Sequence, residues 1–151
     1  QTLLAALSKE PLYAVLDAAR DDRILELLKA APEQYRSLYE GIQGETLAEV
    51  APYLVGPFTA GSTLFRSLVR EGWGRRWGIW LTSRAPFRDV RRQLRRFLMV
   101  ELEDRNGTVY FRFYDPWVWD ALWPTRSERQ KTDRSGGILT WLHLEKEEQR
   151  P

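Results

Sequence analysis

The chain has 151 residues, of which 43% are hydrophobic and 13% aromatic, enough for one folded domain with a core. It contains no cysteine and a single histidine, His143, which excludes disulfides and cysteine zinc sites and argues against a histidine metal site or a Ser/His/Asp centre. No apolar run is long enough to span a membrane and the N-terminus lacks a signal-peptide pattern, so we expect a cytoplasmic protein with no membrane partner.

The net charge of +2 is unevenly distributed along the chain. Residues 1–65 carry 5 basic and 9 acidic side chains, residues 66–96 carry 10 and 2, and residues 97–151 carry 8 and 10. All ten basic residues of the middle segment are arginine, whose planar fork of donors suits carboxylates, phosphates and aromatic faces. The plainest interpretation is a network in which these arginines bind the acidic flanks within one fold.

The first part of the chain alternates between helix and strand patterns. A short helix is expected at Thr2–Leu7, followed by a buried apolar strand over residues 12–16 that ends at Asp17. Asp21 or Asp22 can cap the next helix, which a proline terminates. The segment YRSLYEG then predicts a short strand.

The pattern continues through the middle of the chain. A turn of helix ending before Pro52 leads to a short strand at residues 53–55. Ser62 can cap a helix over residues 63–70, and the apolar segment WGIWLTS predicts a further strand. Pro86 then stands in the first turn of the next helix.

The helix after Pro86 has an apolar face and an adjacent basic face. At 3.6 residues per turn, one arc collects the hydrophobic positions Phe87, Val90, Leu94, Phe97 and Leu98. The adjacent arc collects Arg88, Arg91, Arg92, Arg95 and Arg96, with Arg91 nearest the apolar edge. Such a stripe repels itself, so we expect some members to meet carboxylates from the acidic flanks or from a partner.

The dipeptide Asn106-Gly107 predicts a β-hairpin at about residues 98–114. Its pairing places Phe111 on the core face and Arg112 opposite Glu101. Asp115 can cap a helix whose first residue is Pro116. Trp117 and Trp119 cannot share one helical face, so at least one of them is expected to be exposed.

Strands alternating with helices predict a single layered α/β domain, a mixed β-sheet flanked by helices. The domain is assigned to residues 1–125. Residues 126–151 are interpreted as a polar loop and a C-terminal docking segment of the same domain, in which ILTWLHLE is a last strand or docking segment.

Five blocks of the sequence resemble, in order and spacing, the type VI secretion effector adaptor (chaperone) domain, a family long catalogued as a domain of unknown function. The resemblance covers about residues 12–125, and the blocks are YAVLDAARDDRILELLK, YRSLYEG, LAEVAPYLV, WGRRWGIWLTSRAPFRDVRRQLRRFLMVE and VYFRFYDPWV. It implies a non-enzymatic adaptor without cofactor, which binds a toxic effector and helps to load it onto the valine-glycine repeat spike protein. Many members carry a further C-terminal lobe, so this chain is either a compact member or part of a longer protein.

The resemblance also divides the residues between architecture and contact. Two positions depart from the family pattern: Gln93 stands where histidine is common and Trp117 where arginine is common. The matching signature residues are Asp17, Arg36, Trp77, Gly78, Leu94, Arg95, Arg96, Phe97, Phe111, Arg112, Tyr114, Asp115 and Pro116, and we expect most of them to be structural. The candidates for contacting a partner are Arg88, Arg91, Arg92, Arg95, Trp117, Trp119 and Trp123.

Two other classes of function remain open from the residues alone. The basic block Arg66–Arg96 with its neighbouring aromatics could bind nucleic acid, although the absence of lysine there and the nearly neutral total charge count against it. A hydrolase based on paired carboxylates such as Asp17 and Asp115 is a weaker alternative, because neither a histidine nor a metal cluster accompanies the pair.

Overall fold

The computed structural model of the chain describes residues 10–72, 74–98 and 140–142. Its strands are β1 (Leu12–Asp17), β2 (Tyr35–Ser37), β3 (Pro52–Phe58), β4 (Gly78–Thr82) and β5 (Thr140–Leu142). Its helices are the 3-10 turn η1 (Ala18–Arg20), α2 (Asp22–Ala30), α3 (Gly41–Thr46), α4 (Thr63–Gly72) and α5 (Phe87–Leu98). Strand and helix alternate, so the predicted α/β class is confirmed.

The five strands form one sheet in the order β2-β3-β1-β4-β5. Every pairing among the described strands is antiparallel, so the sheet is not of the mixed type that we predicted. Alternating strands and helices favour layers but do not determine strand direction. Here β2 runs parallel to β1 without touching it, because β3 lies between them and pairs with both.

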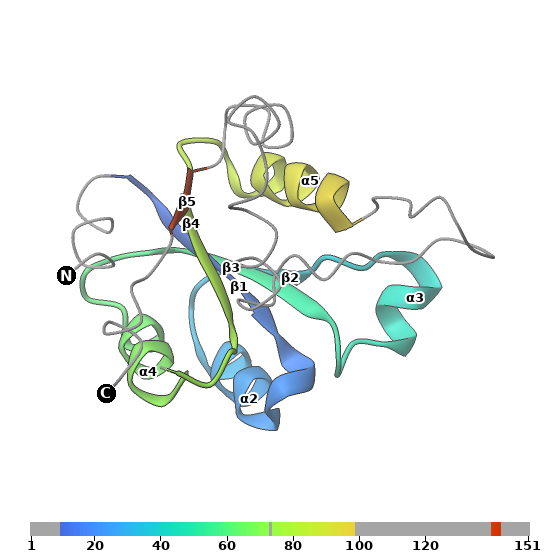
Figure 1. Cartoon of the computed structure of the whole chain (residues 1–151), viewed down its shortest axis with the longest axis horizontal. Coiled ribbons are helices and arrows are strands. Elements are labelled where there is room, and N and C mark those ends of the chain that lie inside the picture. The colour runs from blue at the N-terminus through green and yellow to red at the C-terminus, as the bar shows by residue number, and fades with distance from the viewer. Residues whose placement is uncertain (1–9, 73, 99–139, 143–151) are drawn as a thin grey trace.

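Side chains of the central strand β1 alternate between two hydrophobic cores, one on each face of the sheet. Leu12, Ala14 and Leu16 pack with α2 and α4, whereas Tyr13 and Val15 pack with α5. Figure 1 shows the resulting layers, with α2 and α4 on one side of the sheet and α5 on the other. Helix α5, which carries the arginines, therefore packs on the face of the sheet opposite α2 and α4.

Short polar side chains begin the helices where the sequence predicts caps. The carboxylate of Asp21 accepts a hydrogen bond from the Arg23 amide at the start of α2. The hydroxyl of Ser62 accepts one from the Phe65 amide at the start of α4. Both predicted caps are confirmed.

The region before β3 differs from the prediction. The turn of helix expected before Pro52 is a hydrogen-bonded turn, and α3 lies further upstream. Strand β3 also extends beyond residue 55, through a Gly-Pro pair that usually ends a strand. The pairing with β1 is irregular there, and residue 56 has a φ of +137°, which glycine adopts readily because it lacks a Cβ.

Several predicted elements lie outside the described residues: the helix at Thr2–Leu7, the hairpin after Leu98, and the segment with Asp115 and the tryptophans. Strand β5 falls within ILTWLHLE, the segment expected to supply a last strand or docking segment. Over the described ranges, none of the helices has the length and apolar character needed to cross a membrane.

Candidate interaction surface on helix α5

One face of α5 is buried against the sheet, as its sequence pattern predicts. Phe87, Val90, Leu94 and Leu98 belong to the core formed with the strands, and the last three are fully buried. The side chain of Phe97 is outside the described set. This contact orients the helix, so the directions in which its arginines point are determined by the fold.

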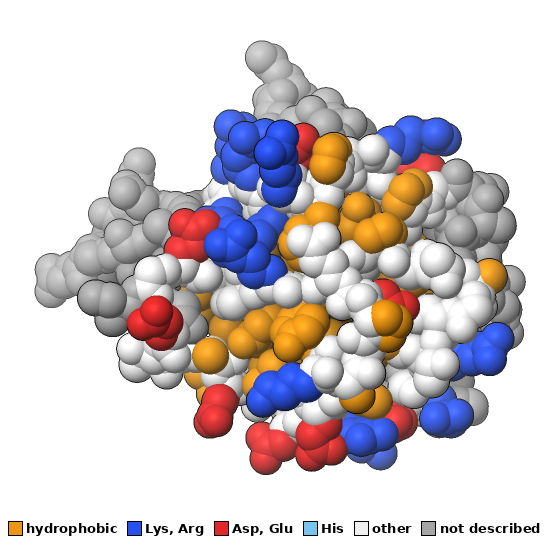
Figure 2. All heavy atoms as spheres, turned by 180° about the vertical axis from the view of Figure 1, so that it is seen from behind, with side chains coloured by type: hydrophobic (Ala, Val, Ile, Leu, Met, Phe, Trp, Pro, Cys, Tyr) orange, Lys and Arg blue, Asp and Glu red, His pale blue; other side chains and the backbone are white. Residues whose placement is uncertain are grey.

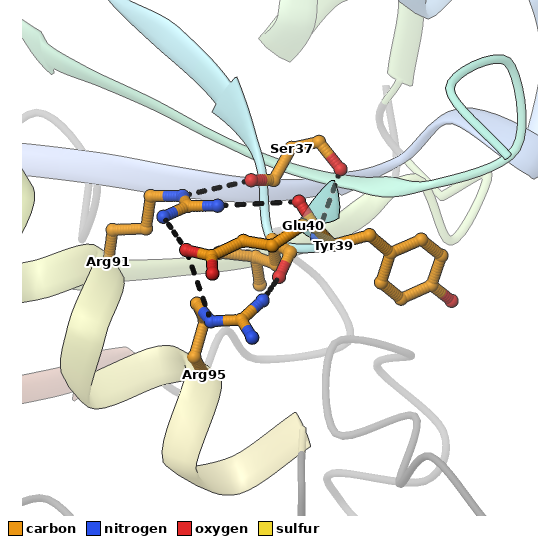
Figure 3. A network of polar contacts seen from close by, with 6 residues as sticks. Ser37, Tyr39, Glu40, Arg91 and Arg95 are labelled. Carbon is orange, nitrogen blue, oxygen red and sulfur yellow. Dashed lines mark hydrogen bonds and ion pairs between the residues drawn. The ribbon is translucent and has the colours of Figure 1, made fainter. Parts of the chain in front are cut away.

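Arg91 and Arg95 form an inner pair that binds the chain around β2. Arg91 donates from Nε to the carbonyl oxygen of Ser37 at 2.9 Å and from Nη1 to a carboxylate oxygen of Glu40 at 2.8 Å. Arg95 donates to the carbonyl oxygen of Leu38, and its Nε lies 3.6 Å from Glu40. Figure 3 shows the Glu40 carboxylate between the two guanidinium groups. The expectation that some arginines meet carboxylates of the acidic flanks is thereby confirmed.

Arg91 also covers the side of strand β2 that faces away from β3. Residues 34 and 38 make backbone hydrogen bonds to β3, so the intervening odd-numbered residues direct their backbone groups away from β3. Arg91 reaches the outward carbonyl of Ser37 and, just beyond the strand, the carbonyl of Tyr39 at 3.4 Å. Among the described strands β2 lies at an edge of the sheet, where unpaired backbone groups are an aggregation risk, and Arg91 satisfies part of this edge.

Glu40 is the residue of this network that the sequence analysis did not identify. The hydrogen bond from Arg91 and the charge of Arg95 hold the pKa of its carboxyl below the ordinary value of 4.5. Glu40 lies in the acidic N-terminal part of the chain, where the sequence analysis expected carboxylate partners for the arginines without identifying which ones. Pairing it with residue 91 required the strand order, because β2 lies two strands away from β1.

Arg88, Arg92 and Arg96 form an outer row on α5. They follow one another at intervals of four residues, so their side chains lie on one line of the helix. The side chains of Arg88 and Arg92 are 90% and 71% exposed, and Arg96 is exposed as well. Figure 2 shows Lys and Arg side chains gathered in the upper part of this face, where α5 lies, beside acidic side chains and above a hydrophobic area.

Asp89 is the one carboxylate among the described residues that pairs with the outer row. Its Oδ1 lies 2.7 Å from Nη2 of Arg92 and 4.0 Å from Nε of Arg88. Two of the three guanidinium groups therefore share one carboxylate, and Arg96 pairs with no described carboxylate. The predicted contact residues thus separate into Arg91 and Arg95, which serve the fold, and Arg88 and Arg92, which face outward.

The basic block Arg66–Arg96 is split by the sheet. Arg66 and Arg70 are exposed on α4, which packs on the face opposite α5. Arg75 and Arg76 lie in the turn after α4. The block is consequently not one continuous basic stripe.

Three of the predicted structural residues have structural contacts at the end of β1. Asp17 is 1% exposed, accepts a hydrogen bond from the Ala19 amide at 3.1 Å, and donates its own amide to the Trp77 carbonyl at 2.7 Å. Trp77 is buried in the core of α2 and α4. Gly78 pairs with Leu16 across the strands. Asp17 is therefore a buried turn-capping residue.

The remaining predicted site residues lie outside the described part of the chain, so their roles stay predictions. They comprise Phe111, Arg112, Tyr114, Asp115, Pro116, Trp117, Trp119 and Trp123. The proposed carboxylate pair includes Asp115 and so has no geometry to assess. Among the described residues, no group of three His, Cys, Asp or Glu side chains could hold a metal ion.

Comparison with known proteins identifies the family to which the chain belongs. The family model described as Domain of unknown function (DUF4123) matches residues 12–133. Since the match covers most of the chain, the protein belongs to this family. Comparisons with curated proteins and with solved structures found no match.

Proposed function

We propose that the protein is a non-enzymatic adaptor of the cytoplasm. It binds a type VI secretion effector and helps to load it onto the valine-glycine repeat spike protein. The five sequence blocks that resemble the effector adaptor domain support this proposal, and they fall within the range matched by the family model. The residues alone contribute the charge asymmetry, which gives α5 more arginine than its fold uses.

The observation that carries the proposal is the outer row. Its arginines stand on a helix that is held by a buried hydrophobic face and by the inner pair. An adaptor needs an accessible and rigid surface of this kind, because ordering a flexible surface on binding costs affinity. Arginine is also among the residues most enriched at the centres of protein interfaces.

Binding to each proposed partner tests the function. The tagged chain is purified from cells that co-express either the effector or the spike protein encoded beside it. We expect each to co-elute with the chain, whereas an effector from an unrelated secretion system serves as a negative control. If neither partner co-elutes, the adaptor function is wrong.

A gel-shift titration separates this function from nucleic-acid binding. Phosphate contacts release counterions, so such binding weakens steeply as salt rises. Because the sheet divides the basic block, we expect no retardation of single-stranded or duplex DNA at physiological salt. Retardation that disappears steeply with salt would favour the nucleic-acid alternative.

A further inference from the structure

The outer row holds three positive charges, of which the described fold neutralises only part through the single carboxylate of Asp89. Arg88 and Arg96 are eight residues apart, so the row is about 12 Å long at 1.5 Å per residue. Arg96 forms no ion pair with any described residue, and Arg88 lies at the 4.0 Å limit from Asp89. Like charges four residues apart on a helix repel each other, so the row opposes folding of the isolated domain.

The position of Arg88 reinforces this point. It is the second residue of α5, and the free amide groups of a first helical turn already concentrate positive charge. A cation is unfavourable there, and the side chain is almost fully exposed. Helix stability therefore gives no reason for an arginine at this position, whereas a negatively charged partner would.

The fold holds the row in place before any partner arrives. Leu94 and Val90 bury the opposite side of the helix, and Arg91 binds three acceptors in β2 and the residues that follow it. The backbone of the row therefore needs no ordering on binding. The Cα positions of consecutive members of the row are four residues apart, a rise of about 6 Å along the helix.

We propose that the outer row docks an acidic segment of a partner protein. Carboxylates accept the paired donors of arginine, and a spacing of about 6 Å occurs between every fourth residue of a helix or every second residue of a strand. This inference rests on the proposed function and names the surface and the chemistry of one contact of the adaptor.

Carboxylates fit the row better than a nucleic-acid backbone. Asp89 stands inside the row and Glu40, which is 51% exposed, stands beside it, so the positive charge is confined to a short stretch and does not form the continuous track that a long phosphate backbone needs. The row itself is short. The arginines that would have to extend it, Arg66 and Arg70, lie across the sheet on α4.

Charge reversal with a matched control tests this docking surface. The variant R88E/R92E changes two exposed arginines four residues apart on α5, and R66E/R70E makes the same change on α4. Affinities for the purified effector and spike protein are measured by calorimetry at physiological salt. We expect R88E/R92E to weaken binding of one partner by at least about tenfold and R66E/R70E by less than about twofold.

Circular dichroism and thermal unfolding show whether both variants are folded. Overlapping peptides that cover the affected partner then locate the acidic segment, and replacing its carboxylates by arginine is expected to restore binding to R88E/R92E. If the unmodified chain binds its partners and R88E/R92E binds them equally well, the docking surface is wrong and the adaptor function stands. If the unmodified chain binds neither partner, the adaptor function fails as well.

Discussion

At the scale of single residues, the adjacent arginines Arg91 and Arg92 of α5 make different contacts. The side chain of Arg91 is 8% exposed and bonds to two backbone carbonyls and to Glu40, whereas that of Arg92 is 71% exposed and pairs with Asp89. Successive residues of a helix are rotated by 100°, which is sufficient to bury the side chain of Arg91 and to leave that of Arg92 in solvent. Equal residue types in adjacent positions thus contribute differently to folding and to binding.

Replacing each of these arginines by glutamine tests the difference. Arg91→Gln leaves the Ser37 and Tyr39 carbonyls without their donors, so we expect a loss of about 1–3 kcal/mol in the free energy of unfolding. Arg92→Gln should change it by less than about 0.5 kcal/mol. Urea unfolding measures both. An Arg91→Gln protein as stable as the unmodified chain would show that the Arg91 contacts do not stabilise the fold.

The Glu40 carboxylate predicts a dependence of stability on pH. Its pKa is lower in the folded state than in the unfolded state, so its contribution is full above the ordinary value of 4.5 and is lost as pH falls through the lowered value. We therefore expect Glu40→Gln to be less stable than the unmodified chain at about pH 7, with the difference shrinking below about pH 4.5.

Urea unfolding of both proteins across this pH range provides the measurement. Glu49→Gln is the control, because Glu49 is exposed and makes no ion pair with any described residue. A difference between Glu40→Gln and the unmodified chain that stays constant down to pH 3 would contradict the role assigned to the arginine pair.

At the scale of elements, close approach between β1 and β4 sets the geometry of the central sheet. Gly78 pairs with Leu16, and a Cβ at position 78 would lie 1.9 Å from the carbonyl oxygen of Val15. Such a contact is with backbone, so no side-chain rotation can relieve it. The strands themselves would have to move apart.

Gly78→Ala tests the importance of this approach. We expect it to lower the free energy of unfolding by at least about 1–3 kcal/mol, because the strand pair must shift to admit a methyl group. Gly61→Ala is the matched control, since a Cβ at position 61 would meet nothing within 4 Å. Thermal or urea unfolding compares the two. A Gly78→Ala protein as stable as Gly61→Ala would show that β1 and β4 are less closely packed than described.

The sequence predicts these elements better than it predicts their arrangement. The caps at Asp21 and Ser62 and the apolar face of α5 follow from contacts within a few residues, so local patterns reveal them. The antiparallel direction of the sheet depends on β3 lying between β1 and β2, which no local pattern encodes. The extension of β3 through Gly56 depends on its pairing with β1 in the same way.

The same limit applies to the candidate site. The basic face of α5 is evident from helical periodicity, but its division into an inner pair and an outer row depends on where Glu40 and the β2 carbonyls lie. Glu40 and the Ser37 carbonyl are 51 and 54 residues away from Arg91 in the sequence. Only the strand order brings them to α5.

At the scale of the whole molecule, the sheet separates two sets of arginines and leaves α5 as the rigid basic face on its own side. The adaptor function proposed above requires that the chain join an effector to the spike protein.

Assembly of the three proteins tests this claim most directly. The effector and the spike protein are mixed with and without the chain, and light scattering after size-exclusion chromatography gives the mass of each complex. We predict a species that contains all three proteins and that does not form when the chain is omitted. An effector and spike protein that associate equally well without the chain, or a chain that joins neither of them, would contradict the account.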